Sequence, residues 1–279
     1  RRQTAERDAP DMRLGVVSDV HHCVQPRPGA SYHNPYDVAG ALGRLRGALQ
    51  WFADEQVDAV VLDGDLADLG DGPSLAGVVE AVENCWAGPA LAVPGNHDVQ
   101  EHPDALARAV AECGRGGVHM ASTDGTEHGG VRIAGIDRVD GSARLAGEAW
   151  GAGPVVVATH FPLLSRADAV QRHGLKYAGD LPGRERVLAG VLGRAGTVVV
   201  NGHLHVRETH ADGGLLQLSV AALVEPPFEA TILDLERQTV RRRAVRMREA
   251  DVAQEPVLSP ADETWAFDAG RWLPVTAGR

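Results

Sequence analysis

Residues 90–98 read Ala-Leu-Ala-Val-Pro-Gly-Asn-His-Asp, so a short apolar run ends abruptly in a cluster of polar side chains. The apolar half has the length of a buried strand. Asn96, His97 and Asp98, which follow it, carry groups that bind metals or protons. In open α/β sheets, ligands bind at the carboxyl ends of the strands. The stretch therefore predicts an α/β protein with a polar site at one edge of a sheet.

The same arrangement occurs four more times along the chain. Further strands are expected at Leu14–Ser18, Val57–Leu62, Val155–Thr159 and Thr197–Val200. The polar residues that follow them are Asp19 and His21, then Asp65, then His160, and finally His203 and His205. Segments with helical spacing of apolar residues separate the strands, at Val38–Glu55, Ser74–Trp86, Pro103–Cys113 and Arg184–Leu192. Since the carboxyl ends of neighbouring strands share an edge, we expect these polar residues to meet.

The side chains expected at this edge are typical of a metal site. Asp19 and His21 are two residues apart, so on extended backbone they would point to the same side, as would His203 and His205. Mixed imidazole and carboxylate ligands favour Zn, Fe or Mn over Ca or Mg. Together with Asp65, Asn96 and His160, the set comprises about seven ligands. That is enough for two transition-metal ions and too many for one.

These motifs resemble one known superfamily. Asp19-x-His21, Gly64-Asp65, Gly95-Asn96-His97-Asp98, His160 and Gly202-His203-x-His205 occur in the order and strand context of the calcineurin-like metallophosphoesterases, over roughly residues 12–235. The resemblance implies a four-layer α/β/β/α sandwich of two mixed sheets, with a dinuclear metal site at the strand carboxyl ends. Carried over residue by residue, the first metal is held by Asp19, His21 and His205, the second by Asn96, His160 and His203, and Asp65 bridges them.

The expected reaction is hydrolysis of a phosphate ester. Two divalent or trivalent ions (Mn, Fe or Zn) some 3.5–4 Å apart can hold a hydroxide that attacks phosphorus in line with the leaving group. His97 is expected to donate a proton to the leaving group or to stabilise its charge, with Asp98 orienting the ring. His22, Asn34 and Tyr177 are expected to contact the substrate.

The motifs narrow the substrate only in part. Leu69 and Asp98 stand where serine/threonine protein phosphatases of the superfamily carry Arg and Glu. The compact bacterial branch fits better, and it includes cyclic-nucleotide and glycerophosphodiester phosphodiesterases beside phosphomonoesterases. We expect a small phosphomonoester, such as a nucleotide or a biosynthetic intermediate, with a cyclic-nucleotide or glycerol phosphodiesterase as the alternative. An inactive binding scaffold of the same fold is a remote alternative, and a serine hydrolase is disfavoured because the sequence has no Gly-x-Ser-x-Gly motif.

Composition limits the partners and the location. The 279 residues carry a net charge of -11, which argues against a nucleic acid polymer as partner. No apolar run is long enough to span a membrane, and three cysteines are too few for a disulfide framework, so we expect a cytoplasmic protein. Residues 1–11 are expected to be a disordered extension, 12–248 a single domain, and 249–279 a C-terminal strap packed on that domain.

Overall fold

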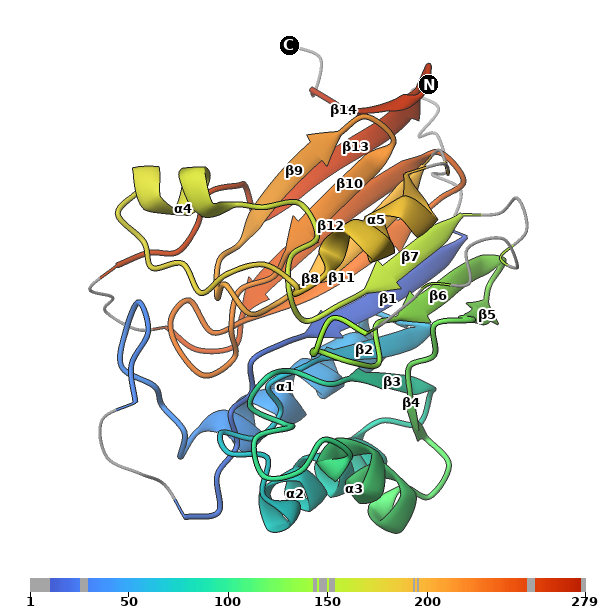
Figure 1. The fold of residues 1–279 in the computed structure, drawn as a ribbon. Coiled ribbons are helices and arrows are strands. Elements are labelled where there is room, and N and C mark those ends of the chain that lie inside the picture. Colours follow the sequence, from blue (N-terminus) through green and yellow to red (C-terminus); the bar gives the residue numbers. More distant parts are fainter. Residues whose placement is uncertain are drawn as a thin grey trace, which may run out of the picture.

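A computed structural model describes residues 11–25, 30–142, 145, 150, 154–192, 194, 196–249 and 254–276. In it, two mixed β-sheets pack face to face, and helices cover the outer face of each (Figure 1). The four-layer sandwich expected from the resemblance is confirmed. Residues 1–10 of the expected N-terminal extension lie outside the described residues. No helix in the described ranges is both long enough and apolar enough to cross a membrane.

The first sheet has the strand order β14-β13-β12-β11-β1-β2-β3-β4. Its parallel strands are β1 (Met12–Val17), β2 (Ala59–Asp63), β3 (Ala90–Val93) and β4 (Val118–Met120). Its antiparallel strands are β11 (Glu229–Leu235), β12 (Thr239–Arg246), β13 (Asp262–Asp268) and β14 (Arg271–Pro274). The helices on its outer face are α1 (Ala41–Asp54), α2 (Gly72–Cys85) and α3 (Ala105–Cys113).

The second sheet has the strand order β5-β6-β7-β8-β10-β9. Its parallel strands are β6 (Val131–Gly135), β7 (Val155–Ala158), β8 (Thr197–Asn201) and β10 (Leu215–Ser219). The antiparallel edge strands are β5 (Thr126–His128) and β9 (Glu208–Asp212). Helix α5 (Arg184–Val191) covers its outer face, and the short helix α4 (Ala167–Arg172) lies between β7 and α5 in the chain.

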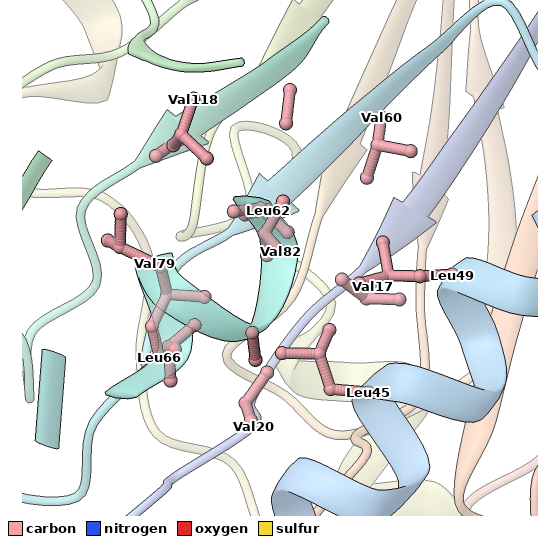
Figure 2. Packing of buried hydrophobic residues seen from close by; sticks show 14 of the residues in the cluster. Val17, Val20, Leu45, Leu49, Val60, Leu62, Leu66, Val79, Val82 and Val118 are labelled. Carbon is pink, nitrogen blue, oxygen red and sulfur yellow. The ribbon is translucent and has the colours of Figure 1, made fainter. Parts of the chain in front are cut away.

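The central strands are apolar on both faces because each face is covered. On β1, Val17 faces the helices, while Leu14 and Val16 face the second sheet. Figure 2 shows Val17 close to Leu45 and Leu49 of α1. Each fully buried side chain of this size contributes about 1.5–3 kcal/mol. The continuous apolar runs of the sequence therefore place β1, β2 and β3 rigidly, with their polar carboxyl ends at one rim.

The C-terminal segment adds to the sheet more than a strap would. Residues 262–268 and 271–274 form β13 and β14, which extend the first sheet beyond β12. Trp272 is 5% exposed, packs into the core between the sheets, and donates its indole N–H to the carbonyl of Gly214 at 3.1 Å. This segment thus pairs by backbone hydrogen bonds in addition to packing its aromatic side chains. Residues 250–253 and 277–279 lie outside the described part of the chain.

Candidate metal centre

The carboxyl ends of five strands from both sheets bring the expected ligands together. The Nε2 atom of His205 lies 3.1 Å from Oδ1 of Asp19, and Nε2 of His160 lies 3.1 Å from Oδ2 of Asp65. His21 links these two His–Asp pairs, because its Nε2 atom is 3.7 Å from the same Asp65 oxygen. Three sets of side chains in the described part of the chain have ligand atoms within 4.8 Å of one another. Two consist of expected ligands, namely Asp19, His21 and His205, and Asp65, His160 and His203, and the third is His21, Asp68 and His97.

Asn96 comes to the same place through its neighbour. The backbone N–H of His97 donates to Oδ1 of Asp65 at 2.7 Å, which fixes the turn that carries Asn96. The amide oxygen of Asn96 is buried without a hydrogen-bond partner in the described part of the chain. Asn96 therefore lies in a turn held against Asp65, next to the other six expected ligands.

The backbone at the centre differs from the extended conformation that we expected for the Asp19 and His205 motifs. Five ligand residues have left-handed φ values, namely Asp19 (53°), His21 (45°), Asp65 (49°), His203 (63°) and His205 (51°). Such values are uncommon for residues other than glycine and cost of order 1–3 kcal/mol each. Long-range hydrogen bonds hold the bends, such as those from the N–H of Asp19 to the carbonyl of Gly64 (3.0 Å) and from His21 to Asp65 (2.8 Å). The paired ligands converge because the chain bends sharply after each strand.

Two glycines are required by the close approach of these bends. A Cβ atom on Gly95 would come within 2.1 Å of Oδ1 of Asp65. A Cβ atom on Gly202 would lie 1.8 Å from Oγ of Ser18 and 2.6 Å from Oδ2 of Asp19. Both distances are far below contact distance, so any side chain at either position would displace a ligand carboxylate.

The donor atoms at the centre fit a pair of transition-metal ions. Five of the seven expected ligands have a buried polar atom without a hydrogen-bond partner among the described residues, namely Asp19 Oδ1, His21 Nε2, Asn96 Oδ1, His160 Nε2 and His203 Nε2. Leaving such atoms unpaired is costly, and buried polar groups are normally hydrogen-bonded. Cations bound among these nitrogen and oxygen atoms would satisfy them.

The opposite ring nitrogens are occupied, which aims each imidazole at the centre. Nδ1 of His21 lies 3.3 Å from Asp68, and Nδ1 of His205 lies 2.5 Å from the fully buried carboxylate of Glu225. Nδ1 of His160 instead bonds to the backbone carbonyl of Asp63 at 2.8 Å. Outer partners of this kind fix the ring orientation and raise the basicity of a metal-ligating histidine. Two histidines of the first set are thus backed by carboxylates.

Charges at the centre are balanced within the protein itself. Burial alone would raise the pKa of Asp19, but the charge and hydrogen bond of His205 and the charge of His160 together outweigh burial and lower that pKa to about 2. Burial opposes protonation of His160 and His205, yet Asp65 and Asp19 respectively raise the two imidazole pKa values to about 10. Burial lowers the pKa of His203 to about 4. In the protein alone, two carboxylates therefore face two imidazolium rings.

His97 reaches the edge of the centre, and its side chain is 30% exposed. Its Nδ1 atom lies 2.6 Å from the backbone carbonyl of Asp68, and its ring centroid is 4.7 Å from that of His21. Asp98 is fully buried, and its two carboxylate oxygens accept the N–H groups of Ala67 and Gly95, both at 2.9 Å. The residue that orients the His97 ring is therefore Asp68, whereas Asp98 braces the two loops.

The three residues expected to contact substrate are held by the protein. His22 packs its ring toward Gly77 of α2, on the helix side of the first sheet. Asn34 is 3% exposed and bonds through its side chain to the backbone of Gln254. The hydroxyl of Tyr177 bonds to Ser165 and Asp180. His22 thus faces α2, Asn34 anchors a loop, and a contact of Tyr177 with substrate stays a prediction.

Comparison with known sequences identifies the family. The sequence model of the calcineurin-like phosphoesterases matches residues 12–207, which contain all seven ligands and His97. The chain belongs to this family. No curated protein sequence matched the chain.

Solved structures with the same fold include two small proteins and one larger one. A dimetal phosphatase from Danio rerio has a TM-score of 0.67 at 16% identity, over 93% of this chain and 100% of that one. The protein TT1561 of Thermus thermophilus has a TM-score of 0.54 at 14% identity, over 85% and 99%. A purple acid phosphatase from yellow lupin has a TM-score of 0.52 at 14% identity, over 87% of this chain and 52% of that one. At these identities the likeness shows the fold.

Proposed function

We propose that the protein is a dinuclear metal-dependent phosphohydrolase that cleaves a small phosphomonoester. The observation that carries the proposal is the convergence of two ligand sets, in each of which the ligand atoms lie within 4.8 Å of one another. The sets are Asp19, His21 and His205, and Asp65, His160 and His203. His97 supports it further, since it lies beside these sets and is partly open to solvent.

The donor set divides naturally between two ions. Asp19, His21 and His205 would hold the first ion, Asn96, His160 and His203 the second, and Asp65 would touch both. When bound, the ions would act as Lewis acids toward the phosphate oxygens and lower the pKa of water. Mn, Fe and Zn suit this mixture of imidazole, carboxylate and amide ligands.

The chain's own residues orient the ligand histidines and place His97 to move a proton. The carboxylates of Glu225 and Asp68 keep His205 and His21 turned toward the centre. The carbonyl of Asp68 accepts a hydrogen bond from Nδ1 of His97, so Nε2 of that ring is free to serve the leaving oxygen. A proton delivered by Nε2 would neutralise the departing alkoxide, a contribution of about 10²–10⁴-fold in rate.

The first experiment compares substrate classes on the Mn²⁺-loaded and the EDTA-treated protein. We expect hydrolysis of p-nitrophenyl phosphate that depends on metal, and slower hydrolysis of bis-p-nitrophenyl phosphate and of cyclic nucleotides. A faster reaction with the diesters would establish the phosphodiesterase alternative instead. A protein that binds two ions per chain but hydrolyses neither class would be a binding scaffold.

Three variants test the residue roles. His97→Ala should lower kcat at least 100-fold and leave the metal content, measured by mass spectrometry, near two ions per chain. Asp65→Ala should lose metal. His119→Ala removes an exposed histidine from β4 and serves as the matched control, with unchanged kcat and metal content. Full activity of Asp65→Ala would contradict the ligand assignment.

A further inference from the structure

One exposed basic side chain close to the Tyr32 ring differs from several arginines nearby. The arginines on neighbouring segments are held by carboxylates, in the pairs Arg44–Asp37, Arg166–Glu208, Arg184–Asp180 and Arg248–Asp37. Lys176, the single lysine of the sequence, forms no ion pair within the described part of the chain. Its ammonium lies 5.7 Å from the centre of the Tyr32 ring.

Tyr32 connects this cation to the metal centre. Its ring centroid is 5.1 Å from that of His205, a ligand of the first set. Its hydroxyl is buried and has no hydrogen-bond partner among the residues that the structure describes. A tyrosine hydroxyl carries an O–H group, so it can donate a hydrogen bond to a ligand.

The loop that carries Tyr32 is tied to the metal motif and to Lys176. Nε2 of His33 donates to the carbonyl of Leu204, which lies between two ligand histidines, at 2.9 Å. Nδ1 of the same ring accepts the backbone N–H of Lys176 at 3.3 Å. The N–H of Asn34 donates to Glu225, the carboxylate that backs His205. These backbone contacts therefore fix the segments that carry Tyr32 and Lys176 relative to His205.

The two side chains have a chemical preference in common. An ammonium group has three donors and no acceptor, and a protonated phenol without a partner is available as a donor. Hydrogen bonds that involve an ionised partner are about twice as strong as neutral ones. The long, flexible stem of Lys176 allows its ammonium to leave the Tyr32 ring for a ligand. A group that satisfies both donors must present negatively charged oxygen.

We infer that Tyr32 and Lys176 form a subsite beside the metal centre that takes a second anionic group of the substrate, so that the ester cleaved here carries a further carboxylate or phosphate. This inference rests on the proposed function. It deepens that function by separating substrates with one anionic group from substrates with two.

The kinetic test uses two esters that differ in one group. 3-Phosphoglycerate and glycerol 3-phosphate have the same carbon skeleton, and a carboxylate in the first replaces a hydroxymethyl group in the second. For the Mn²⁺-loaded protein we expect kcat/KM to favour 3-phosphoglycerate at least fivefold. Lys176→Met and Tyr32→Phe should each reduce this preference, Lys176→Met nearly abolishing it. Arg172→Met removes an exposed cation from the last turn of α4 and should keep the ratio within twofold of the wild type.

A labelling test has a readout other than turnover. Because Lys176 is the single lysine, it and the N-terminal amine are the two primary amines that an amine-selective acetylating reagent can modify, and mass spectrometry resolves them. The non-hydrolysable phosphonate analogue of 3-phosphoglycerate should slow acetylation of Lys176 at least threefold in the Mn²⁺-loaded protein. The analogue of glycerol 3-phosphate should not, and the N-terminal amine is the internal reference.

The outcomes separate the subsite from the reaction. A preference that is absent in the wild type, or that Lys176→Met leaves unchanged, overturns the subsite while hydrolysis of p-nitrophenyl phosphate keeps the proposed function standing. If no ester is hydrolysed, the proposed function fails. The labelling test then decides the subsite alone, since equal acetylation with both analogues would refute it.

Discussion

Loading the EDTA-treated protein with metal should release about two protons per chain at pH 6. The pKa values of His160 and His205 are raised to about 10 by Asp65 and Asp19, so both imidazoles are protonated at that pH. Metal ligands must be neutral imidazoles, so each proton has to leave when an ion binds. Asp19, with a pKa lowered to about 2, is already ionised and releases none.

The remaining ligands add few protons to the number released when metal binds. Burial lowers the pKa of His21, and that of His203 to about 4, so these two rings bind as they stand. The pKa of Asp65 is lowered by His160 against the effect of burial, so this carboxylate is also ionised. At pH 6 ionisation of metal-bound water adds little, because its pKa lies near 7 for Zn²⁺.

Isothermal titration calorimetry measures the number directly. The apparent binding enthalpy is plotted against the ionisation enthalpy of several non-coordinating buffers, and the slope gives the protons released. A slope near two, with apparent affinity rising steeply between pH 6 and 8, is the expected result. A slope near zero would mean that both rings are neutral before metal binds, and would refute the charge balance drawn for the centre.

Three further results are expected. In the metal-free protein, protonated His160 and His205 contribute to stability because the pKa values of both rings are raised in the folded state. This contribution is complete below pH 6.5 and is lost as the pH rises toward 10. Thermal melts of the EDTA-treated protein from pH 6 to 10 measure the loss. Gly95→Ala should displace Asp65 and weaken metal binding, measured by calorimetry, at least 100-fold. Gly43→Ala is the control, because a Cβ atom at this position of α1 would meet open space, and it should stabilise the fold by about 0.5–1 kcal/mol. Trp272→Ala should cost about 3–5 kcal/mol in urea unfolding if β14 is part of the core; a loss below 1 kcal/mol would contradict this.

The sequence was sufficient to predict the strands that position the site. Runs such as Val155–Ala158 are apolar at every position, which is typical of strands covered on both faces. The metal motifs follow these runs directly, so the ligand set could be assembled from strand ends and a family resemblance. A strand that is buried on both faces needs consecutive apolar residues, and such a run can be recognised in the sequence without knowledge of distant contacts.

The bends and the outer partners depend on distant contacts and could not be predicted in the same way. Asp19 adopts its left-handed conformation against Gly64, a residue of the next strand's motif. Glu225 reaches His205 from a loop twenty residues later in the chain, with no periodic pattern around it. The contact of Asp68 with His97 and the bonds of Asp98 to Ala67 and Gly95 depend on how two loops pack together.

The C-terminal strands were missed for a different reason. Residues 262–268 read Asp-Glu-Thr-Trp-Ala-Phe-Asp, which lacks the alternation of a half-buried strand, and the burial of this strand is only intermediate. The edge strand β9 is also polar along most of its length. Strands at or next to a sheet edge are held largely by backbone pairing, which does not show in the hydrophobicity of the sequence.

The left-handed bends also change how this centre has to be dissected by mutagenesis. Replacing Asp19 or His203 with alanine removes the metal ligand but keeps a Cβ atom on a residue with left-handed φ. The variant therefore retains the conformational cost of the bend although it no longer binds metal there. Glycine at the same position would release that tension, and the difference in unfolding free energy between the glycine and alanine versions would report how much tension each bend stores. Measuring this difference in unfolding free energy at all five left-handed positions, without metal, would rank how strongly the folded protein holds each bend before an ion binds.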